Sequence, residues 1–287
     1  MIIVTGANGQ LGRAVVERLL VRVPAEQVGV SVRDPEKAQE LEAHGVRVRR
    51  GDFDDPASLT HAFEGASQVL IVSSNTSGEM AVHHHRTAID TARKVGTRRI
   101  LYTSHMGSSP TSPFPPMVDH AATEVALRDS GVAFTSLRNG FYATTAVMLL
   151  RNALQTGELV APEDGPVAWT THSDLAEGVA SILSEEVLDG VTPPLTASEA
   201  FDMAGIATLA SELTQRPIRR VVVPDAEYRA GLVAHSIPEA GADMLLGIFR
   251  ASRRGDFARV DPTLAHLIGR SPIPLRDVLK AAISSDR

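Results

Sequence analysis

The stretch MIIVTGANGQLG, residues 1–12, decides the fold of this chain. A strand-like apolar run, Ile2–Val4, leads directly into Thr5–Gly12, where glycines stand at positions 6, 9 and 12, and an amphipathic helix is expected over Gln10–Val21. Glycine permits a tight turn and lets the backbone approach a pyrophosphate, and the N-terminus of the helix offers free N–H groups to phosphates. This order of strand, glycine loop and helix predicts a dinucleotide site, with a plain tight turn as the alternative.

Strand-length apolar runs then alternate with helical patterns as far as Asn139. Such alternation indicates βαβ units and a parallel sheet. We therefore predict an α/β fold in which a Rossmann-type doubly wound parallel sheet occupies residues 1–140 and a smaller mixed α/β lobe occupies residues 141–287, with segments from 166–204 crossing back to the first domain. The expected strands are Ile2–Val4, Val28–Val32, Val46–Arg49, Gln68–Ser73, Arg99–Ser104 and Val132–Leu137, and the expected helices are Gln10–Val21, Pro35–Ala43, Pro56–Phe63, Glu79–Val95 and one over Met117–Leu127 and beyond.

Beyond Asn139 the pattern is less regular. Strands are expected at Trp169–Asp174 and Phe201–Met203, and a helix is expected at Ser173–Ser184 with Ser173 as its N-cap. Further helices are expected at Ile206–Thr214, Asp225–His235, Pro262–Ile268 and Pro274–Ile283.

The composition limits the class of protein. The chain has 287 residues, 43% of them hydrophobic, with a net charge of −6 and no cysteine. The lack of cysteine excludes disulfides, thiol nucleophiles and cysteine-ligated metal sites, and the acidic balance argues against nucleic acid as a partner. No apolar run approaches the roughly 18 residues of a membrane span, and no signal peptide is expected. We therefore predict a cytoplasmic protein without membrane insertion.

The residues after the second expected strand distinguish between the two nicotinamide dinucleotides. An NAD site usually carries an acidic residue there to bind the ribose 2′-hydroxyl, but this chain has Arg33, followed by Asp34. A guanidinium favours a 2′-phosphate through charge-assisted hydrogen bonds, and Lys37 lies one helical turn further on. We predict NADPH as the cofactor and NADH as the less favoured one. In the alternative, Asp34 binds the ribose of NAD while Arg33 stacks on the adenine.

Two further strand ends border this site. Asp52, after the third strand, can accept a hydrogen bond from the adenine amino group while Phe53 contributes its backbone, although a simple turn explains both residues equally well. Ser73, Ser74 and Asn75 end the fourth strand. Ligands of open α/β sheets bind outside the carboxyl ends of the strands, so these three residues are also expected to face the dinucleotide.

Five segments carry a family resemblance: TGANGQLG (5–12), SVRDPEKA (31–38), LYTS (101–104), DSG (129–131) and SLRNGFY (136–142). Together they make the chain similar to the NmrA-like branch of the atypical short-chain dehydrogenases/reductases. Within that branch it is most similar to the bacterial NmrA-type NAD(P)H:quinone oxidoreductases, with triphenylmethane reductase as a relative. The resemblance covers nearly the whole length and implies the Rossmann fold and an NADP cofactor. Several members are reductases, and others bind NADP without known chemistry.

The resemblance also implies roles for individual residues. The glycine loop would hold the pyrophosphate, Arg33 would hold the 2′-phosphate, and the loop after the sixth strand would border both nicotinamide and substrate. Phe141 and Tyr142 in that loop are the surfaces on which a flat quinone would stack, unless they only pack the two lobes together. The cofactor-binding residues predicted in all are Gly6, Ala7, Asn8, Gly9, Gln10, Leu11, Gly12, Arg33, Lys37, Asp52, Phe53, Ser73, Ser74, Asn75, Arg138, Asn139, Gly140, Phe141 and Tyr142.

The usual proton donor of short-chain dehydrogenases, a tyrosine with a lysine four residues later, is absent from the sequence. Four residues beyond the three tyrosines Tyr102, Tyr142 and Tyr228 stand Met106, Ala146 and Leu232. On the helix where the resemblance would place the pair, His120 and Glu124 lie on one face instead. A neutral histidine can hydrogen-bond a quinone oxygen, and Glu124 is expected to raise the pKa of the imidazole. Because a quinone accepts hydride to give a stabilised phenolate and a cationic dye needs no proton, the absence favours these acceptors.

The remaining candidates complete the predicted site. The substrate pocket is predicted to contain Ser104, Met106, His120, Phe141 and Tyr142, with His120 and Tyr142 as catalytic residues. No metal is predicted, because consecutive helical residues point about 100° apart, so that His83–His85 cannot converge on one ion and is expected to be a solvated helix start. Trp169 is expected in the core, and Asp174 is expected to be structural.

We therefore predict an NADPH-dependent reductase that passes hydride to a quinone or a similar electron-poor aromatic acceptor. The alternative is a non-catalytic NADP(H)-sensing regulator of the NmrA type, which the missing tyrosine–lysine pair suits equally well. An epimerase or lyase is disfavoured because it too would normally need the tyrosine. The expected partner is the small acceptor, and the chain is expected to be a monomer or a homodimer.

Overall fold

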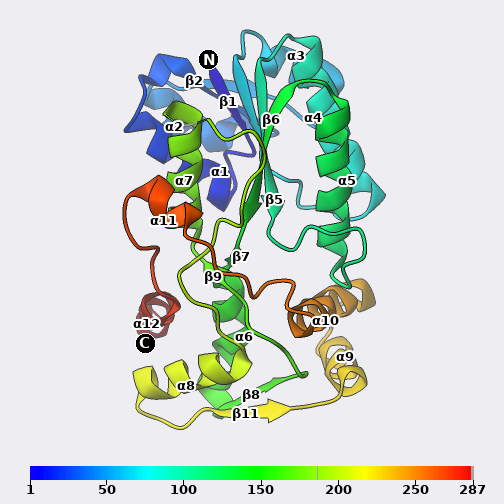
Figure 1. Ribbon diagram of the computed structural model, residues 1–287, viewed down its shortest axis with the longest axis vertical. Coiled ribbons are helices and arrows are strands. Elements are labelled where there is room, and N and C mark those ends of the chain that lie inside the picture. Colours follow the sequence, from blue (N-terminus) through cyan, green and yellow to red (C-terminus); the bar gives the residue numbers. More distant parts are fainter. Residues whose placement is uncertain (186, 286–287) are drawn as a thin grey trace.

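The computed structural model describes residues 1–185 and 187–285. A seven-stranded sheet stands between two layers of helices, and a smaller lobe lies beyond one end of it (Figure 1). The strand order is β10-β6-β5-β4-β1-β2-β3, and all neighbouring strands are parallel. The predicted Rossmann-type sheet is therefore present. Its strands are β1 (Ile2–Thr5), β2 (Val28–Val32), β3 (Arg47–Arg50), β4 (Gln68–Ile71), β5 (Arg99–His105), β6 (Ala133–Asn139) and β10 (Gly190–Val191).

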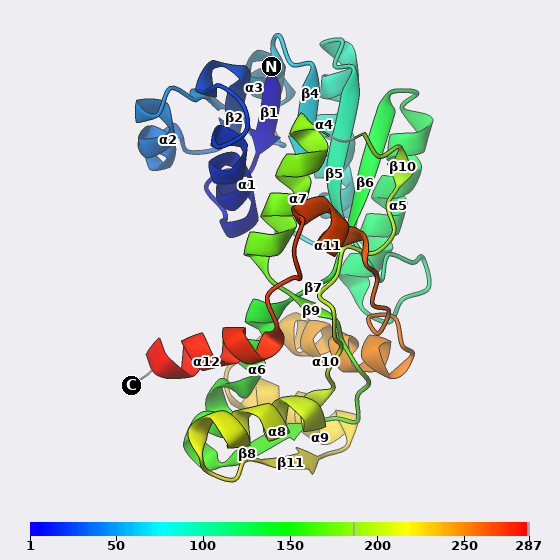
Figure 2. The ribbon, with the colours of Figure 1, turned by 60° about the vertical axis from the view of Figure 1, so that its left-hand side comes forward.

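Helices cover both faces of the sheet, which explains why its central strands are apolar on both sides. One face carries α1 (Gln10–Leu20), α2 (Gln39–Ala43) and α7 (His172–Ser184), and the other carries α3 (Pro56–Phe63), α4 (Glu79–Lys94) and α5 (Pro115–Asp129) (Figure 1, Figure 2). Two 3-10 turns, Ala25–Gln27 and Pro35–Ala38, and α11 (Thr263–Ile268), which packs on α7, complete this part. Each helical layer buries its own apolar core against the sheet.

The smaller lobe lies beyond the carboxyl ends of the strands, where a parallel sheet binds its ligands. Its core joins the sheet through aromatic rings: Phe141 meets Phe114, Phe257 and Trp169 at centroid distances of 5.8, 5.0 and 5.4 Å. The elements of this part are β7 (Phe141–Tyr142), α6 (Ala143–Thr156), β8 (Glu158–Ala161), β9 (Trp169–Thr170), α8 (Met203–Thr214), β11 (Arg219–Val222), α9 (Asp225–Ala234), α10 (Glu239–Arg253) and α12 (Leu275–Ser285). The division of the chain at residue 140 stays a prediction, while β10 pairs with β6 in the large sheet and α7 packs on α1.

Two local predictions are wrong. The N-cap of α7 is Thr171 rather than Ser173, because the Thr171 hydroxyl accepts a hydrogen bond from the Asp174 N–H at 3.1 Å. The segment Phe201–Met203 makes only an isolated bridge to Val167, and α8 already begins at Met203. In both places a capping side chain ends the extended stretch earlier than the apolar pattern indicates.

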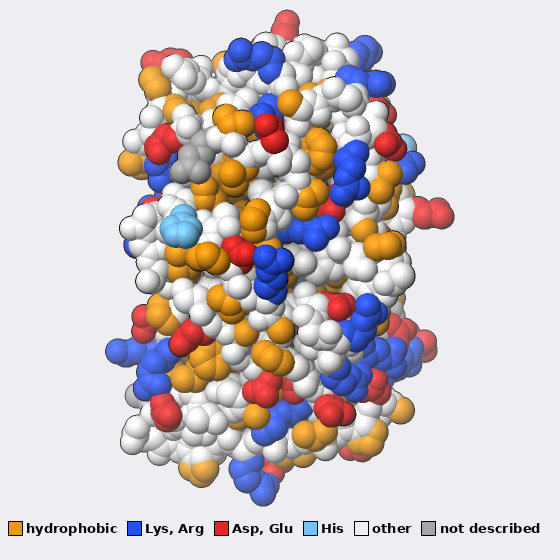
Figure 3. Space-filling model, viewed as in Figure 1, with side chains coloured by type: hydrophobic (Ala, Val, Ile, Leu, Met, Phe, Trp, Pro, Cys, Tyr) orange, Lys and Arg blue, Asp and Glu red, His pale blue; other side chains and the backbone are white. Residues whose placement is uncertain are grey.

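The surface carries charges of both signs. On the face shown in Figure 3, arginines and carboxylates gather over α9 and α10, where Arg229 pairs with Asp243 and Arg253 pairs with Asp225. Among the helices that the structure describes, none has the length and apolar character needed to cross a bilayer.

Candidate active site

A cleft of about 630 Å³ lies at the carboxyl ends of β1 to β4, where the strand order reverses between β1 and β4. Both its position and its volume are typical of a dinucleotide site in an open α/β sheet. Ten of the predicted cofactor residues line it: Gly6, Asn8, Gly9, Arg33, Lys37, Asp52, Phe53, Ser73, Ser74 and Asn75.

The glycine loop leaves the N-terminus of α1 open to an anion. Gly6 takes a left-handed conformation with φ +65°, and its carbonyl accepts the Gly9 N–H at 2.9 Å. A Cβ at Gly12 would lie 2.5 Å from the Gly6 oxygen, so only glycine lets the helix pack this closely on the loop. The first turn of α1 contains no acidic residue, and no capping side chain is found for it in the described part of the chain. The N–H groups of this turn therefore fit a pyrophosphate.

At the far end of the cleft, Arg33 is exposed, and no hydrogen bond or ion pair of its guanidinium is found within residues 1–185 and 187–285. The neighbouring Asp34 is already engaged, because its carboxylate lies 3.1 Å from the Lys37 ammonium and its carbonyl accepts from the Asn8 amide at 2.8 Å. A free guanidinium beside a neutralised carboxylate suits a ribose 2′-phosphate better than a 2′-hydroxyl.

The prediction that His83–His85 form a solvated helix start is wrong for two of the three residues. His84 and His85 are buried rather than solvated, and only His83 is exposed. The His84 ring lines the cleft between Asp54, whose Oδ1 lies 2.9 Å from Nε2, and Ser74, whose Oγ lies 3.0 Å from Nδ1. These histidines support the cofactor loop. Among the described residues, no group of three side chains is arranged to hold a metal ion.

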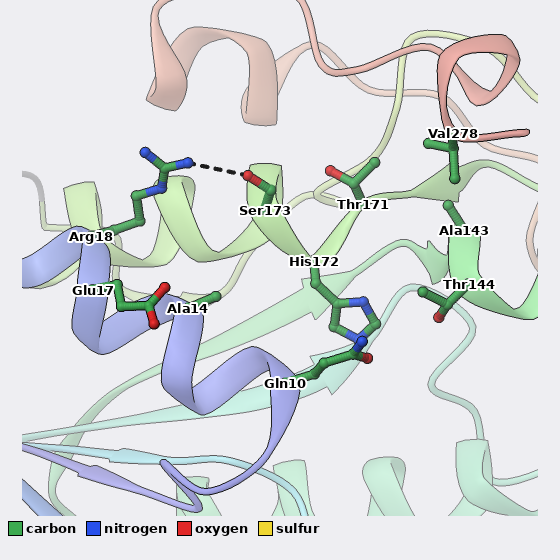
Figure 4. Close-up of a pocket in the computed structure, with 10 residues that line it drawn as sticks. All are labelled: Gln10, Ala14, Glu17, Arg18, Ala143, Thr144, Thr171, His172, Ser173 and Val278. Carbon is green, nitrogen blue, oxygen red and sulfur yellow. Dashed lines mark hydrogen bonds between the residues drawn. The ribbon is translucent and has the colours of Figure 1, made fainter. Parts of the chain in front are cut away.

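Nine of the predicted cofactor residues do not line the cleft, and four of them belong to the glycine loop and the start of α1. Ala7 and Leu11 are buried, Gly12 packs on Gly6, and Gln10 lines a second cavity of about 570 Å³ between α1, α6 and α7. In Figure 4 the Gln10 amide lies beside the ring of His172. That ring also stacks on Tyr142 at a centroid distance of 4.2 Å.

Tyr142 therefore presents its ring to His172. Burial raises the pKa of the Tyr142 hydroxyl and lowers the pKa of the His172 imidazole, so both are neutral in this contact. The catalytic role of Tyr142 stays a prediction.

The loop after β6 holds the remaining cofactor candidates. Phe141 is only 6% exposed, and its ring packs inside the aromatic cluster that joins the two lobes. A Cβ at Gly140 would lie 2.2 Å from the Thr170 hydroxyl, which requires glycine there. Asn139 is 1% exposed, and neither atom of its amide has a partner at hydrogen-bond geometry among the described residues, although the amide lies close enough to the Tyr142 hydroxyl to lower the pKa of the phenol. A buried amide in this state is expected to pair with a ligand, and a carboxamide such as that of nicotinamide offers the complementary groups.

The buried carboxylate of Glu124 binds side chains of β5 and β6. Its Oε1 accepts from the Ser104 hydroxyl at 2.8 Å, the Ser136 hydroxyl at 3.1 Å and Arg138 Nε at 3.0 Å, and its Oε2 accepts from Arg138 Nη2 at 2.8 Å. Burial alone raises the pKa of Glu124, but the hydrogen bonds from Arg138 and Ser104 and the positive charge of Arg138 outweigh it, so the pKa is below its usual value. Arg138, a predicted cofactor residue, is thus bound to Glu124.

His120 lies one turn before Glu124 without a hydrogen bond to it. The His120 Nδ1 atom is 2.7 Å from the hydroxyl of Tyr102 on β5, and its ring stacks on His105 at 6.2 Å. Burial lowers the pKa of His120 to about 4, although the charge of Glu124 acts in the opposite direction. Glu124 therefore raises the pKa of His120 as predicted, but burial has the larger effect and the net shift is downward.

Two more predicted substrate residues lie around this pair. Ser104 is 3% exposed and Met106 is 8% exposed, and the Met106 N–H donates to the Asn139 carbonyl at 2.8 Å. The cluster around His120 thus offers neutral hydrogen-bonding groups and a compensated carboxylate, and neither is a strong acid at neutral pH.

The chain is similar to known proteins over nearly its whole length. The sequence matches the NAD(P)H-binding family over residues 6–186. Quinone oxidoreductase 2 of Escherichia coli is 36% identical over 281 residues, covering 96% of each chain. The structure of the NADPH-dependent quinone oxidoreductase from Escherichia coli complexed with NADPH has a TM-score of 0.94 at 33% identity, covering 99% of this chain and 100% of that chain. The Citrobacter sp. triphenylmethane reductase complexed with NADP(H) has a TM-score of 0.91 at 33% identity, covering 98% and 100%. The resemblance drawn from the sequence is confirmed.

Proposed function

The chain belongs to the NAD(P)H-binding family, and from this premise we propose that it transfers hydride from NADPH to a quinone or a similar electron-poor aromatic acceptor. The relatives are named oxidoreductases, and two of them are solved in complex with NADPH or NADP(H). The chain is accordingly an NAD(P)H-dependent oxidoreductase with NADPH as its cofactor. The quinone-like acceptor is the proposal. The cytoplasmic location and the monomeric or homodimeric state stay predictions.

One observation carries the choice of acceptor. The helix position that serves proton donation in most short-chain dehydrogenases holds His120, whose pKa is lowered to about 4 by burial, and Glu124, which is bound by Arg138. Neither group is an acid matched to neutral pH, as reduction of a simple ketone would require. A quinone gives a stabilised phenolate that water can protonate, so it is a suitable substrate for such a site.

The residues of the chain fit the cofactor. When bound, the reduced nicotinamide supplies the hydride. The first-turn N–H groups of α1 would hold the pyrophosphate, Arg33 and Lys37 would hold the 2′-phosphate, and the buried amide of Asn139 would hold the carboxamide. The buried ring of Phe141, two residues after Asn139, belongs to the aromatic cluster that joins the smaller lobe to the sheet. His120, at the edge of this region, donates a hydrogen bond to an oxygen of the acceptor.

The proposal is tested by following NADPH absorbance with benzoquinone, menadione or malachite green added to the purified protein. Turnover with at least one acceptor is expected, together with tighter binding of NADPH than of NADH. Measurable NADPH binding without turnover of any acceptor would refute the reductase and favour the NADP(H)-sensing regulator. That alternative is not favoured now, because the relatives are named as enzymes.

A further inference from the structure

We propose that hydrogen bonds running inward from the cofactor loop fix the tautomer of His120, so that Nε2 carries the proton and serves as a donor to a carbonyl acceptor. Tyr102 and His85 are positioning residues in this chain of hydrogen bonds. The acceptor part of the inference rests on the proposed function. The tautomer itself is a property of this chain alone and can be tested without turnover.

The first step is the protonation of His85. Its Nε2 atom lies 2.9 Å from the backbone nitrogen of Ser74, and a backbone N–H can only donate, so Nε2 carries no proton. The Nδ1 atom therefore holds the proton of the neutral ring and donates it to Thr123 Oγ1 at 2.8 Å. Thr123 can accept because its own hydroxyl donates to the Asp119 carbonyl at 2.8 Å. Burial lowers the pKa of His85 to about 3, which keeps the ring neutral.

The second step is the direction of the Tyr102 hydroxyl. Tyr102 is completely buried, and its oxygen lies 3.4 Å from His85 Nδ1 and 2.7 Å from His120 Nδ1, while a side-chain hydrogen bond from Thr123 also acts on the pKa of the phenol. His85 Nδ1 already carries a proton and cannot accept. The Thr123 hydroxyl already accepts from His85 and donates to the Asp119 carbonyl, so we assign the phenol proton to His120 Nδ1, which makes the shortest contact with the Tyr102 oxygen. Burial raises the pKa of Tyr102, so the phenol keeps its proton.

The third step gives the state of His120. With Nδ1 occupied as an acceptor, the proton of the neutral imidazole must lie on Nε2. Tyr102 is in the core behind Nδ1, so Nε2 faces the other way on this half-buried residue, and no partner for it is found among the described residues.

The groups around the ring do not reverse this state. The Nδ1 atom of His105 accepts from the Gly107 N–H at 3.1 Å, and burial holds the pKa of His105 well below its usual value, so this ring is neutral. Glu124 is compensated by Arg138, and Asp119 accepts from the Gly78 N–H at 2.8 Å.

The consequence is a selective hydrogen-bond donor. A quinone has a carbonyl oxygen that can accept from Nε2, and this bond strengthens as negative charge develops on the oxygen. A triarylmethyl cation has no oxygen at its reacting carbon, so the same donor does not assist it. Ser74 belongs both to the cofactor cleft and to the hydrogen-bond chain, so the chain starts at a residue that lines the cofactor cleft.

The tautomer can be observed directly. Long-range ¹H–¹⁵N correlation spectra of the whole protein labelled at histidine nitrogens distinguish a protonated from an unprotonated ring nitrogen. The His120→Asn variant assigns the His120 signals by their disappearance. A proton on Nε2 and a bare Nδ1 at neutral pH are expected for His120. A proton on Nδ1, or an imidazolium, would overturn the inference whether or not the enzyme turns over.

The functional part is tested with Tyr102→Phe, which removes the phenol that fixes His120. We expect kcat/KM for menadione to fall about fivefold, which corresponds to one ordinary hydrogen bond, while kcat/KM for malachite green and KM for NADPH stay unchanged. Tyr228→Phe is the matched control, because Tyr228 packs on Phe249 in the other lobe. Equal losses with both acceptors, or no loss with either, would contradict the role of Tyr102. Failure of the wild-type protein with every acceptor would instead refute the proposed function and leave the spectral result standing.

Discussion

Replacing Glu124 by glutamine is expected to lower the free energy of unfolding by about 3 kcal/mol. This carboxylate accepts hydrogen bonds from Ser104, Ser136 and Arg138, and the Arg128 guanidinium forms an ion pair with it at 3.8 Å. An amide of the same shape has only one accepting atom, so Glu124→Gln turns an N–H toward a donor and leaves the Arg138 charge without its partner. Charged hydrogen bonds contribute about 1.5–3 kcal/mol each, and breaking a buried pair costs about 3–5 kcal/mol. We expect the lower end because the Arg138 side chain is 29% exposed and can be rehydrated.

The dependence on pH gives the reasoning a second test. The pKa of Glu124 in the folded protein lies below its ordinary value of 4.5. A carboxyl group with a depressed folded pKa contributes stability above its unfolded pKa and loses it as the pH falls through the folded pKa. The difference between wild type and Glu124→Gln should therefore be constant from neutral pH down to about pH 4.5 and shrink below it.

Urea unfolding followed by fluorescence is the suitable assay, because the chain has a single tryptophan, Trp169, which is buried in the core. Glu199→Gln, at an exposed carboxylate, is the control for a change of one charge. A loss below about 1 kcal/mol at neutral pH would show that Glu124 acts as an ordinary surface carboxylate. A difference that grows as the pH falls would show that the sign of the pKa shift is wrong.

Three further substitutions test the cofactor site. Arg33→Ala should raise KM for NADPH about 10- to 100-fold through loss of a charge-assisted phosphate contact, with little change for NADH; steady-state kinetics that show equal losses would contradict the 2′-phosphate role. Gly12→Ala places a Cβ 2.5 Å from a backbone oxygen of the same loop and should abolish NADPH binding in a fluorescence titration, whereas Gly231→Ala, with no atom within 4 Å, should leave it unchanged. Asn139→Ala removes an amide without partners at hydrogen-bond geometry, so the melting temperature of the cofactor-free protein should not fall, while NADPH binding should weaken about tenfold. A lower melting temperature with unchanged NADPH binding would show that the amide serves the fold.

The large sheet was predictable because its signals are local. The strand before Gly6, the glycine loop and the helix after it are contiguous, and each later strand repeats the same alternation of β and α patterns. The smaller lobe lacks such signals. Helix α6 begins directly after Tyr142 with no capping side chain, and α10 follows Pro238 in the same way. Neither helix start has the serine, threonine, aspartate or asparagine that marks one in a sequence.

The burial of His84 and His85 on α4 can be predicted from the sequence if histidine is counted among the core-facing residues. The buried positions of this helix are Ala81, His84, His85, Ala88, Ile89, Thr91 and Ala92, and all of them except Thr91 repeat at the three- and four-residue spacing of a core-facing stripe. If histidine is counted as a polar residue, this stripe of buried positions is interrupted at its centre. When His84 and His85 count as members of it, the same spacing places both on the buried face. Their partners Ser74 and Thr123 come from other elements and could not be identified from spacing along the chain.

The same limit applies to the proton donor. A search for tyrosine and lysine at i and i+4 correctly finds no such pair. The search compares only residues of the same helix. It cannot find Tyr102, which reaches His120 from the neighbouring strand β5 at a sequence separation of 18. The site therefore keeps a tyrosine next to the expected position but reverses its task, since the buried phenol holds its proton against an imidazole instead of releasing it. An acid stabilised by a lysine charge is replaced by a neutral donor of fixed direction. Such a donor is useful only to an acceptor that tolerates a developing anion, which a quinone does and a simple ketone does not.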